Sequence, residues 1–109
     1  MANDGIFRVL LRMQVKPGQG AEFERVWHES ADTITGQPAN LGQWLSRGED
    51  PEVYYIVSDW TSETEFREYE RSAEHVTHRS RLHPYRESGS MTTMRVLHHL
   101  VGAAAGAPA

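Results

Sequence analysis

The chain has 109 residues, a net charge of −4 and no cysteine. This length fits one domain with a modest core, and the lack of cysteine excludes disulfides, thiolate catalysis, zinc–cysteine sites and iron–sulfur clusters. The basic residues are dispersed, so the sequence predicts no nucleic-acid partner. No run approaches the ~20 apolar residues that span a bilayer, and residues 1–5 lack the features of a signal peptide. We therefore expect a soluble cytoplasmic protein with no membrane partner.

The first half of the chain has the pattern of a strand, a helix and a hairpin. Ile6–Val15 alternates with a period of two, which predicts a strand. Residues 21–35 carry an apolar stripe at helical spacing, followed by Gly36 and Pro38, which predict the end of a helix. A strand at about 41–47 and the run Val53–Trp60 are separated by Gly, Asp and Pro, which predicts a hairpin.

The second half continues with helices and a last strand. Ser62 and Glu65 form a capping-box pattern directly after Trp60, which predicts the start of an amphipathic helix. Ser72 can restart it as a second segment over 73–83. Residues 91–100 read as a final strand. Residues 101–109, VGAAAGAPA, form a small-residue tail that we expect to be mobile.

The order of these elements is β-α-β-β-α-β, the split βαβ or ferredoxin-like plan of the α+β class. It predicts a single domain over residues 1–100, with both helices on one face of a four-stranded antiparallel sheet. The other face would carry Arg8, Leu10 and Arg12. This face is partly apolar, so we expect a homodimer in which two sheets meet, a dimeric α+β barrel.

The candidate catalytic groups lie on the predicted helix that follows Ser72. His75 and Arg79 are four residues apart and project from one face, with His78 near its edge. A histidine that lines an apolar cleft can act as a general base, and a nearby guanidinium can stabilise an enolate or phenolate. The alternative interpretation is solvated surface charge after a helix break, which is about as common for a residue like His75 and more common for His78.

Three aromatic residues could line a pocket next to this face. Trp60 ends a strand, where its ring could form a wall and its indole N–H could donate to a substrate oxygen. Trp27 and Tyr69 would face the sheet from the two helices. For all three residues, core packing is the simpler interpretation.

Metal and nucleotide sites are not predicted. Adjacent strand residues such as His98 and His99 point to opposite faces, and the His75–His78 pair has no identifiable third ligand. Gly18 and Gly20 are too few for a dinucleotide-binding pattern. An enzyme with this sequence would work without a metal or nucleotide cofactor.

The run from Tyr55 to Phe66, YIVSDWTSETEF, resembles the strand-Trp-helix segment of the antibiotic biosynthesis monooxygenase family. Ser72 to His75 is similar to a short Ser-x-x-His segment of that family. Residues 37–41 correspond more loosely to a Pro-Gly-Phe segment of the family. The resemblance spans about residues 6–100 and implies a dimeric α+β barrel. It also implies oxidation of anthrones or hydroquinones to quinones with O₂, without flavin or metal, on aromatic polyketide intermediates.

The resemblance assigns roles to particular positions of this sequence. Trp60 matches the family's strand-end Trp, and Arg79 lies near a helix arginine used in that chemistry. Those oxygenases carry an Asn four residues before the Trp, where this chain has Ile56, so Gln43 or His75 would have to supply a polar group. The predicted catalytic residues are His75, Arg79 and Trp60. The predicted substrate-binding residues are Trp27, Tyr69, Phe66, Ile56, His78 and Gln43.

Two other functions remain open. A polyketide cyclase or aromatase on the same fold would use the same acid–base groups. A non-catalytic module that holds a hydrophobic intermediate would fit Ile56 at the Asn position. Both enzyme hypotheses require a cavity of a few hundred Å³ between sheet and helices that touches Trp60 and His75.

Overall fold

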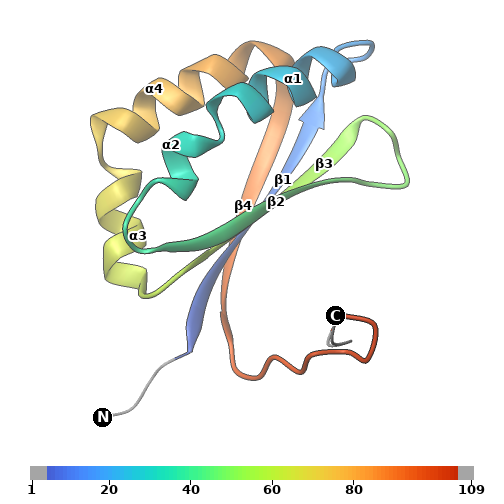
Figure 1. Cartoon of the computed structure of the whole chain (residues 1–109). Helices are drawn as coiled ribbons and strands as arrows, with labels where there is room; N and C mark the ends of the chain where they lie inside the picture. Colours follow the sequence, from blue (N-terminus) through green and yellow to red (C-terminus); the bar gives the residue numbers. More distant parts are fainter. Residues whose placement is uncertain (1–4, 106–109) are drawn as a thin grey trace.

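The computed structural model describes residues 5–105 as a layer of helices on one face of a four-stranded sheet (Figure 1). None of the helices in this part of the chain is long and apolar enough to cross a membrane. The elements, in chain order, are β1 (Ile6–Val15), α1 (Gly20–Ser30), α2 (Asp32–Thr35), β2 (Asn40–Arg47), β3 (Val53–Trp60), α3 (Glu63–Glu70), α4 (Ala73–Leu82), the 3₁₀ turn η1 (His83–Tyr85) and β4 (Arg86–Val96).

The sheet has the predicted ferredoxin-like order, β2-β3-β1-β4, and all neighbouring strands are antiparallel. Cross-strand partners share a face, so the register shows which side chains meet the helices. Leu11 pairs with Ile56, and Ile56 pairs with Leu45, which places this row under the helices. Leu10, Val57 and Trp44 form the adjacent row on the opposite face. The alternation seen in the sequence therefore predicted the two faces of β1 correctly.

The predicted helix over 21–35 is interrupted at Ala31, giving α1 and the short α2. The buried stripe of α1 is Phe23, Trp27 and Ser30. The hydroxyl of Ser30 donates to the Val26 carbonyl at 3.0 Å, and such back-bonding often bends helices. The amide Nε2 of Gln43 donates to the Ala31 carbonyl at 2.8 Å from β2. These two bonds at the break were not foreseeable from the helical spacing.

The helix boundaries in the second half follow the two predicted serine caps. The Ser62 hydroxyl accepts from the Glu65 N–H at 3.2 Å at the start of α3. The Ser72 hydroxyl likewise accepts from the His75 N–H at 3.2 Å at the start of α4. Because each cap satisfies a backbone donor that lacks an intrahelical partner, the chain forms two short helices with a corner between them.

The prediction for the last strand is wrong in its bounds. Strand β4 spans Arg86–Val96, five residues earlier at its start than expected, and His98 and His99 lie beyond it. The sequence around Gly89 looks like a turn, but it pairs with β1 along the sheet edge. The chain after β4 runs below the sheet in Figure 1, with Leu97 and Leu100 exposed. Residues 106–109 of the predicted mobile tail lie outside the described residues.

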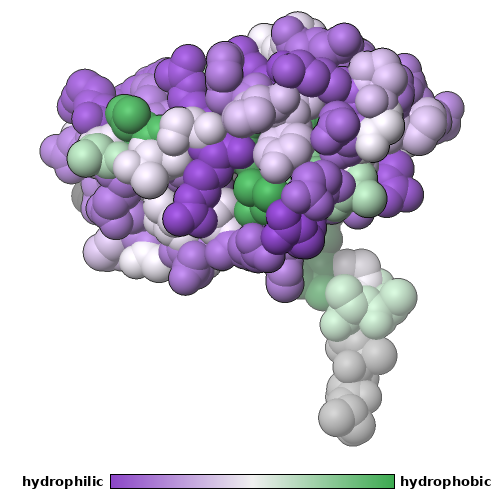
Figure 2. All heavy atoms as spheres, turned by 90° about the horizontal axis from the view of Figure 1, so that it is seen from above, coloured by the Kyte–Doolittle hydropathy of each residue, from purple (hydrophilic) through white to green (hydrophobic). Residues whose placement is uncertain are grey.

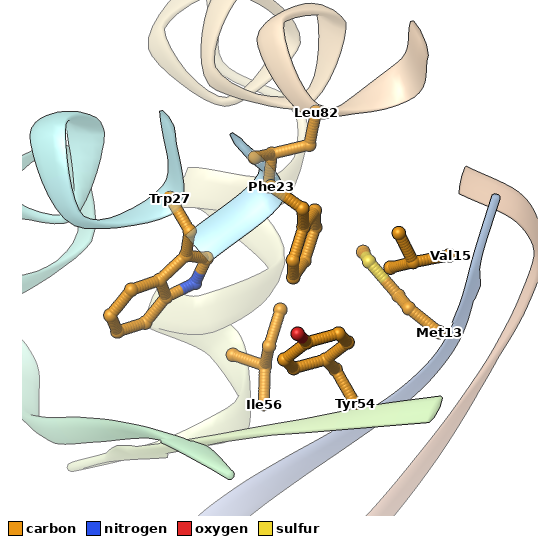
Figure 3. Packing of buried hydrophobic residues seen from close by; sticks show 7 residues of the cluster. All are labelled: Met13, Val15, Phe23, Trp27, Tyr54, Ile56 and Leu82. Atoms are coloured by element: carbon orange, nitrogen blue, oxygen red, sulfur yellow. The ribbon is translucent and has the colours of Figure 1, made fainter. Parts of the chain in front are cut away.

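Buried side chains form two clusters between sheet and helices. The first cluster joins helix and strand side chains in close contact (Figure 3) and comprises Met13, Val15, Phe23, Trp27, Tyr54, Ile56 and Leu82. The second comprises Phe7, Val9, Ala39, Trp60, Phe66 and Tyr69. Leu11 packs against both clusters. Seen from above, the outer surface of the helices is mostly hydrophilic, with only small hydrophobic spots (Figure 2).

Candidate active site

A cavity of about 240 Å³ lies between the sheet and the helices, where the two clusters meet. Its deep wall is formed by buried residues of β1, β3 and α1, including Val9, Ile56 and Trp27. Most of the exposed residues that line it belong to α4, η1 and β4, among them Arg79, His83 and Met91. The cavity therefore opens between helix α4 and the edge strand β4, and it has the predicted contacts with Trp60 and His75.

One wall of the cavity is a stack of aromatic rings. Tyr69 of α3 stacks on Trp60 of β3, with ring centroids 5.4 Å apart and an interplanar angle of 25°. Phe66 meets the same indole ring edge-on at 5.4 Å. The indole N–H of Trp60 donates to the Ser58 hydroxyl at 3.0 Å. The bond from this N–H to a substrate oxygen stays a prediction, and it would require the N–H to leave the Ser58 hydroxyl.

Polar atoms without hydrogen-bond partners gather around the same cavity. Within residues 5–105, buried side-chain atoms without a partner include Nε1 of Trp27, Oη of Tyr69 and Nδ1 of both His75 and His78. All four residues line the cavity. Buried polar groups in folded proteins nearly always have a partner, so an exception requires an explanation. A bound ligand with donor and acceptor groups would satisfy these atoms.

The Ser72 cap sets the position of His75 at the first turn of α4. The imidazole meets the Tyr69 ring edge-on, with centroids 5.2 Å apart. Ser72 also donates to the Tyr69 carbonyl at 2.6 Å, which ties the end of α3 to the start of α4. A serine at this corner therefore brings a phenol and an imidazole together at the cavity.

Burial changes the protonation of these groups in a consistent way. Loss of solvation lowers the pKa of His75, and Arg79 lowers it further, while Glu70 partly offsets both. Burial also lowers the pKa of His78, followed by the charges of His75 and Arg81. Burial raises the pKa of Tyr69 to about 12, with a smaller contribution from Glu74. Near neutral pH the cavity therefore contains two neutral imidazoles and a protonated phenol.

The cavity brings together eight of the nine predicted site residues. The eight that line it are Ile56, Trp60, Phe66, Trp27, Tyr69, His75, His78 and Arg79. Gln43 is not among the lining residues, because its amide instead bonds the Ala31 carbonyl at the helix break. The predicted role of Gln43 in substrate binding is therefore not supported by its position.

The polar lining residues that were not predicted as site residues include Ser58, Glu70 and Arg86. Ser58 lies two residues from Ile56 and Trp60 on the same strand face, so alternation alone could have identified it. Glu70 lines the cavity but is paired with Arg67 at 3.1 Å. Arg86 was missed because the last strand was predicted to start at residue 91, whereas β4 starts at Arg86. Among the described residues no cluster of three or more His, Asp or Glu has a geometry suited to a metal ion.

An apolar cavity with a few polar groups is typical of small-molecule sites, and here it lies in a ferredoxin-like fold. Residues 6–81 match the antibiotic biosynthesis monooxygenase family, and the chain belongs to that family. It is 28% identical over 103 residues to protein SchA of Streptomyces halstedii, covering 94% of this chain but only 27% of SchA. The chain thus spans about a quarter of that relative.

Solved structures of similar proteins show the same fold. One is SnoaB, a cofactor-independent oxygenase from Streptomyces nogalater, with a TM-score of 0.78 and 23% identity, covering 88% of this chain and 97% of SnoaB. Another, described as a putative antibiotic biosynthesis monooxygenase from Bordetella bronchiseptica, has a TM-score of 0.79 and 19% identity, covering 85% of this chain and 98% of that one.

Proposed function

We propose that this chain is a cofactor-independent monooxygenase that oxidises an aromatic polyketide intermediate, an anthrone or hydroquinone, to a quinone with O₂. The observation that carries the proposal is the meeting of an aromatic wall, Trp60 and Tyr69, with the unpartnered imidazole of His75 in one cavity. A flat, electron-rich substrate suits the wall, and a neutral imidazole can take its acidic proton. SnoaB, described as a cofactor-independent oxygenase, shares the fold.

The proposed reaction needs no external reductant. His75 accepts a proton from the substrate, and Arg79 at the cavity rim stabilises the resulting anion. The anion then reduces O₂. For an anthrone, the CH₂ carbon becomes a carbonyl that carries one oxygen atom, and the second oxygen leaves as water. The two C–H bonds lost by the substrate supply all four electrons, so anthrone and O₂ give anthraquinone and water.

Oxygen uptake with anthrone or a dihydroxynaphthalene tests the proposal. We expect uptake above the uncatalysed rate, and about a 100-fold lower kcat/KM in His75→Asn, as for loss of a general base. His28→Asn is the matched control, because His28 is exposed on α1 and does not line the cavity. Absence of catalysed uptake across several such substrates, with the protein folded, would refute the oxygenase function.

A cyclase or aromatase is the second candidate. The contact of His75 with Tyr69 pairs a neutral base with a protonated phenol, the two groups that an aldol closure requires. Such a reaction consumes no O₂. Turnover of a poly-β-ketone substrate under strict anaerobiosis would therefore favour the cyclase, and loss of turnover without O₂ would favour the oxygenase.

The open face of the sheet supports a homodimer as the working unit. Trp44 is 51% exposed and Met94 is 38% exposed on this face, in the rows that contain Val57 and Arg8. A second copy packed sheet to sheet would cover these side chains. Light scattering should give twice the chain mass for the wild type and a monomer for Trp44→Asp. A monomeric wild type at high concentration would exclude the dimer.

A further inference from the structure

We propose that Arg86 forms an anion-binding subsite at the mouth of the cavity, which receives a carboxylate or similar oxyanion carried by the aromatic ligand. The inference rests on the proposed function only in treating the cavity as the ligand site. It concerns the chemical class of that ligand, which the oxidation chemistry alone does not specify.

A β-bulge places the Arg86 side chain at this mouth. In the pairing of β1 with β4, Gln14 is opposite Ser88 and Val15 is opposite Arg86, so Glu87 is an extra residue. The extra residue keeps Arg86 opposite Val15, which is fully buried under the helices. Bulges near functional sites commonly redirect a side chain in this way. Arg86 is thus directed to the helix side of the edge strand, where it lines the cavity.

Gly89 provides the space for the Arg86 guanidinium. A Cβ atom on Gly89 would lie 3.0 Å from Nη1 of Arg86 and 3.3 Å from the Arg12 carbonyl oxygen. The guanidinium therefore lies directly over the glycine, across the part of β4 that borders the cavity. Any larger residue at position 89 would have to displace it.

The Arg86 charge has no partner within the described residues. Five other arginines of the chain form ion pairs with Asp or Glu: Arg8, Arg25, Arg47, Arg67 and Arg95. Among residues 5–105, neither Arg86 nor Arg79 forms an ion pair or a side-chain hydrogen bond. The acidic lining residue Glu70 is instead bound to Arg67. Arg12, which also lines the cavity, likewise forms no ion pair among the described residues, so three arginines border this apolar cavity without an acidic partner.

A guanidinium binds a planar carboxylate through two parallel hydrogen bonds. A ligand whose rings lie against the Trp60–Tyr69 wall could extend an acidic group toward the open side between α4 and β4. The bound anion would then be held by Arg86, with Arg79 on the opposite side of the mouth. Such a contact would select acidic aromatic ligands over neutral ones of the same shape.

Equilibrium binding of anthraquinone-2-carboxylate and its neutral carboxamide, followed by tryptophan fluorescence, tests this subsite. We expect the wild type to bind the acid at least tenfold more tightly, and Arg86→Met to lose most of that preference. Gly89→Ala retains the charge but displaces it, so it should reduce the preference partly. Arg71→Met, which makes the same charge change at an exposed residue outside the cavity, should leave the preference intact.

Equal affinities of the acid and the carboxamide for the wild type would overturn the proposal, as would an unchanged preference in a folded Arg86→Met. Inorganic phosphate distinguishes the source of the anion. Displacement of the acid by low millimolar phosphate would indicate a site for free anions and contradict the proposal. The acid preference without O₂ uptake would support the subsite while refuting the oxygenase. Catalysed O₂ uptake without a preference for the acid would support the oxygenase while refuting the subsite.

Discussion

Two buried tyrosines show how the two ends of the helix–sheet interface differ. Tyr54, in the first cluster, donates its hydroxyl to Oε2 of Glu24 at 2.5 Å, and Arg47 binds the same carboxylate. Tyr69, in the second cluster, has a buried hydroxyl without a partner at the cavity. Both rings are almost fully buried. The Tyr54 hydroxyl is therefore satisfied within the protein, whereas the Tyr69 hydroxyl is a polar group that a ligand would satisfy.

The largest expected effect on stability comes from removing a large side chain from the first cluster. Phe23 is fully buried against Tyr54, with centroids 5.0 Å apart. Phe23→Ala should lower the free energy of unfolding by about 3–5 kcal/mol, because a cavity replaces a close-packed ring. Met91→Ala, at the exposed mouth of the cavity, should cost about 0.5 kcal/mol or less. Urea denaturation measures both losses of stability. Similar losses would contradict the difference between the packed first cluster and the mouth of the cavity.

Removal of each tyrosine hydroxyl compares Tyr54 with Tyr69 directly, and the expected loss of stability is smaller than for Phe23→Ala. Tyr54→Phe should destabilise the protein by about 1–2 kcal/mol, because it removes a hydrogen bond to a carboxylate. It should also raise the pKa of Glu24, which the Tyr54 hydroxyl lowers more than any other group. Tyr69→Phe should be neutral or slightly stabilising, because it removes a buried donor without a partner.

Thermal unfolding and carboxyl NMR titration measure these changes. Tyr69→Phe should also weaken binding of an aromatic ligand, whereas Tyr54→Phe should leave it unchanged. A Tyr69→Phe variant that loses as much stability as Tyr54→Phe would show that the Tyr69 hydroxyl has a partner in solution.

The smallest expected effect is a dependence of stability on pH, between pH 7.5 and 5.5, that arises from the histidines of the cavity. Burial lowers the pKa values of His75 and His78 in the folded protein, so the unfolded chain binds more protons below the ordinary value of 6.5. The stabilisation from their neutral forms is complete above that pH. It is lost as the pH falls through the lowered, folded-state pKa values.

Melting temperatures between pH 7.5 and 5.5 measure this effect. We expect the wild type to lose stability on acidification, and a His75→Asn/His78→Asn variant to lose less. His28→Asn should retain the wild-type slope, because His28 is exposed on α1. An unchanged slope in the double variant would contradict the assignment of the pH dependence to the cavity.

The sequence alone determined the fold and most of the cavity wall. Alternation in β1 and β3 and the serine caps at Ser62 and Ser72 are local patterns, and local patterns determine which face each side chain occupies. They were sufficient to place Trp60, Tyr69 and His75 together. The family resemblance was carried by the same strand-Trp-helix segment, which lies within the matched residues 6–81.

Only the tertiary structure decided the features that depend on contacts distant in the sequence. The amide of Gln43 on β2 is bound to the Ala31 carbonyl at the helix break. Arg86 is placed at the cavity by a bulge in the pairing of β4 with β1. No local pattern encodes these outcomes, because each depends on which backbone or side-chain group the folded chain brings within hydrogen-bond distance. The unpaired charge at the cavity mouth is therefore a property of the fold.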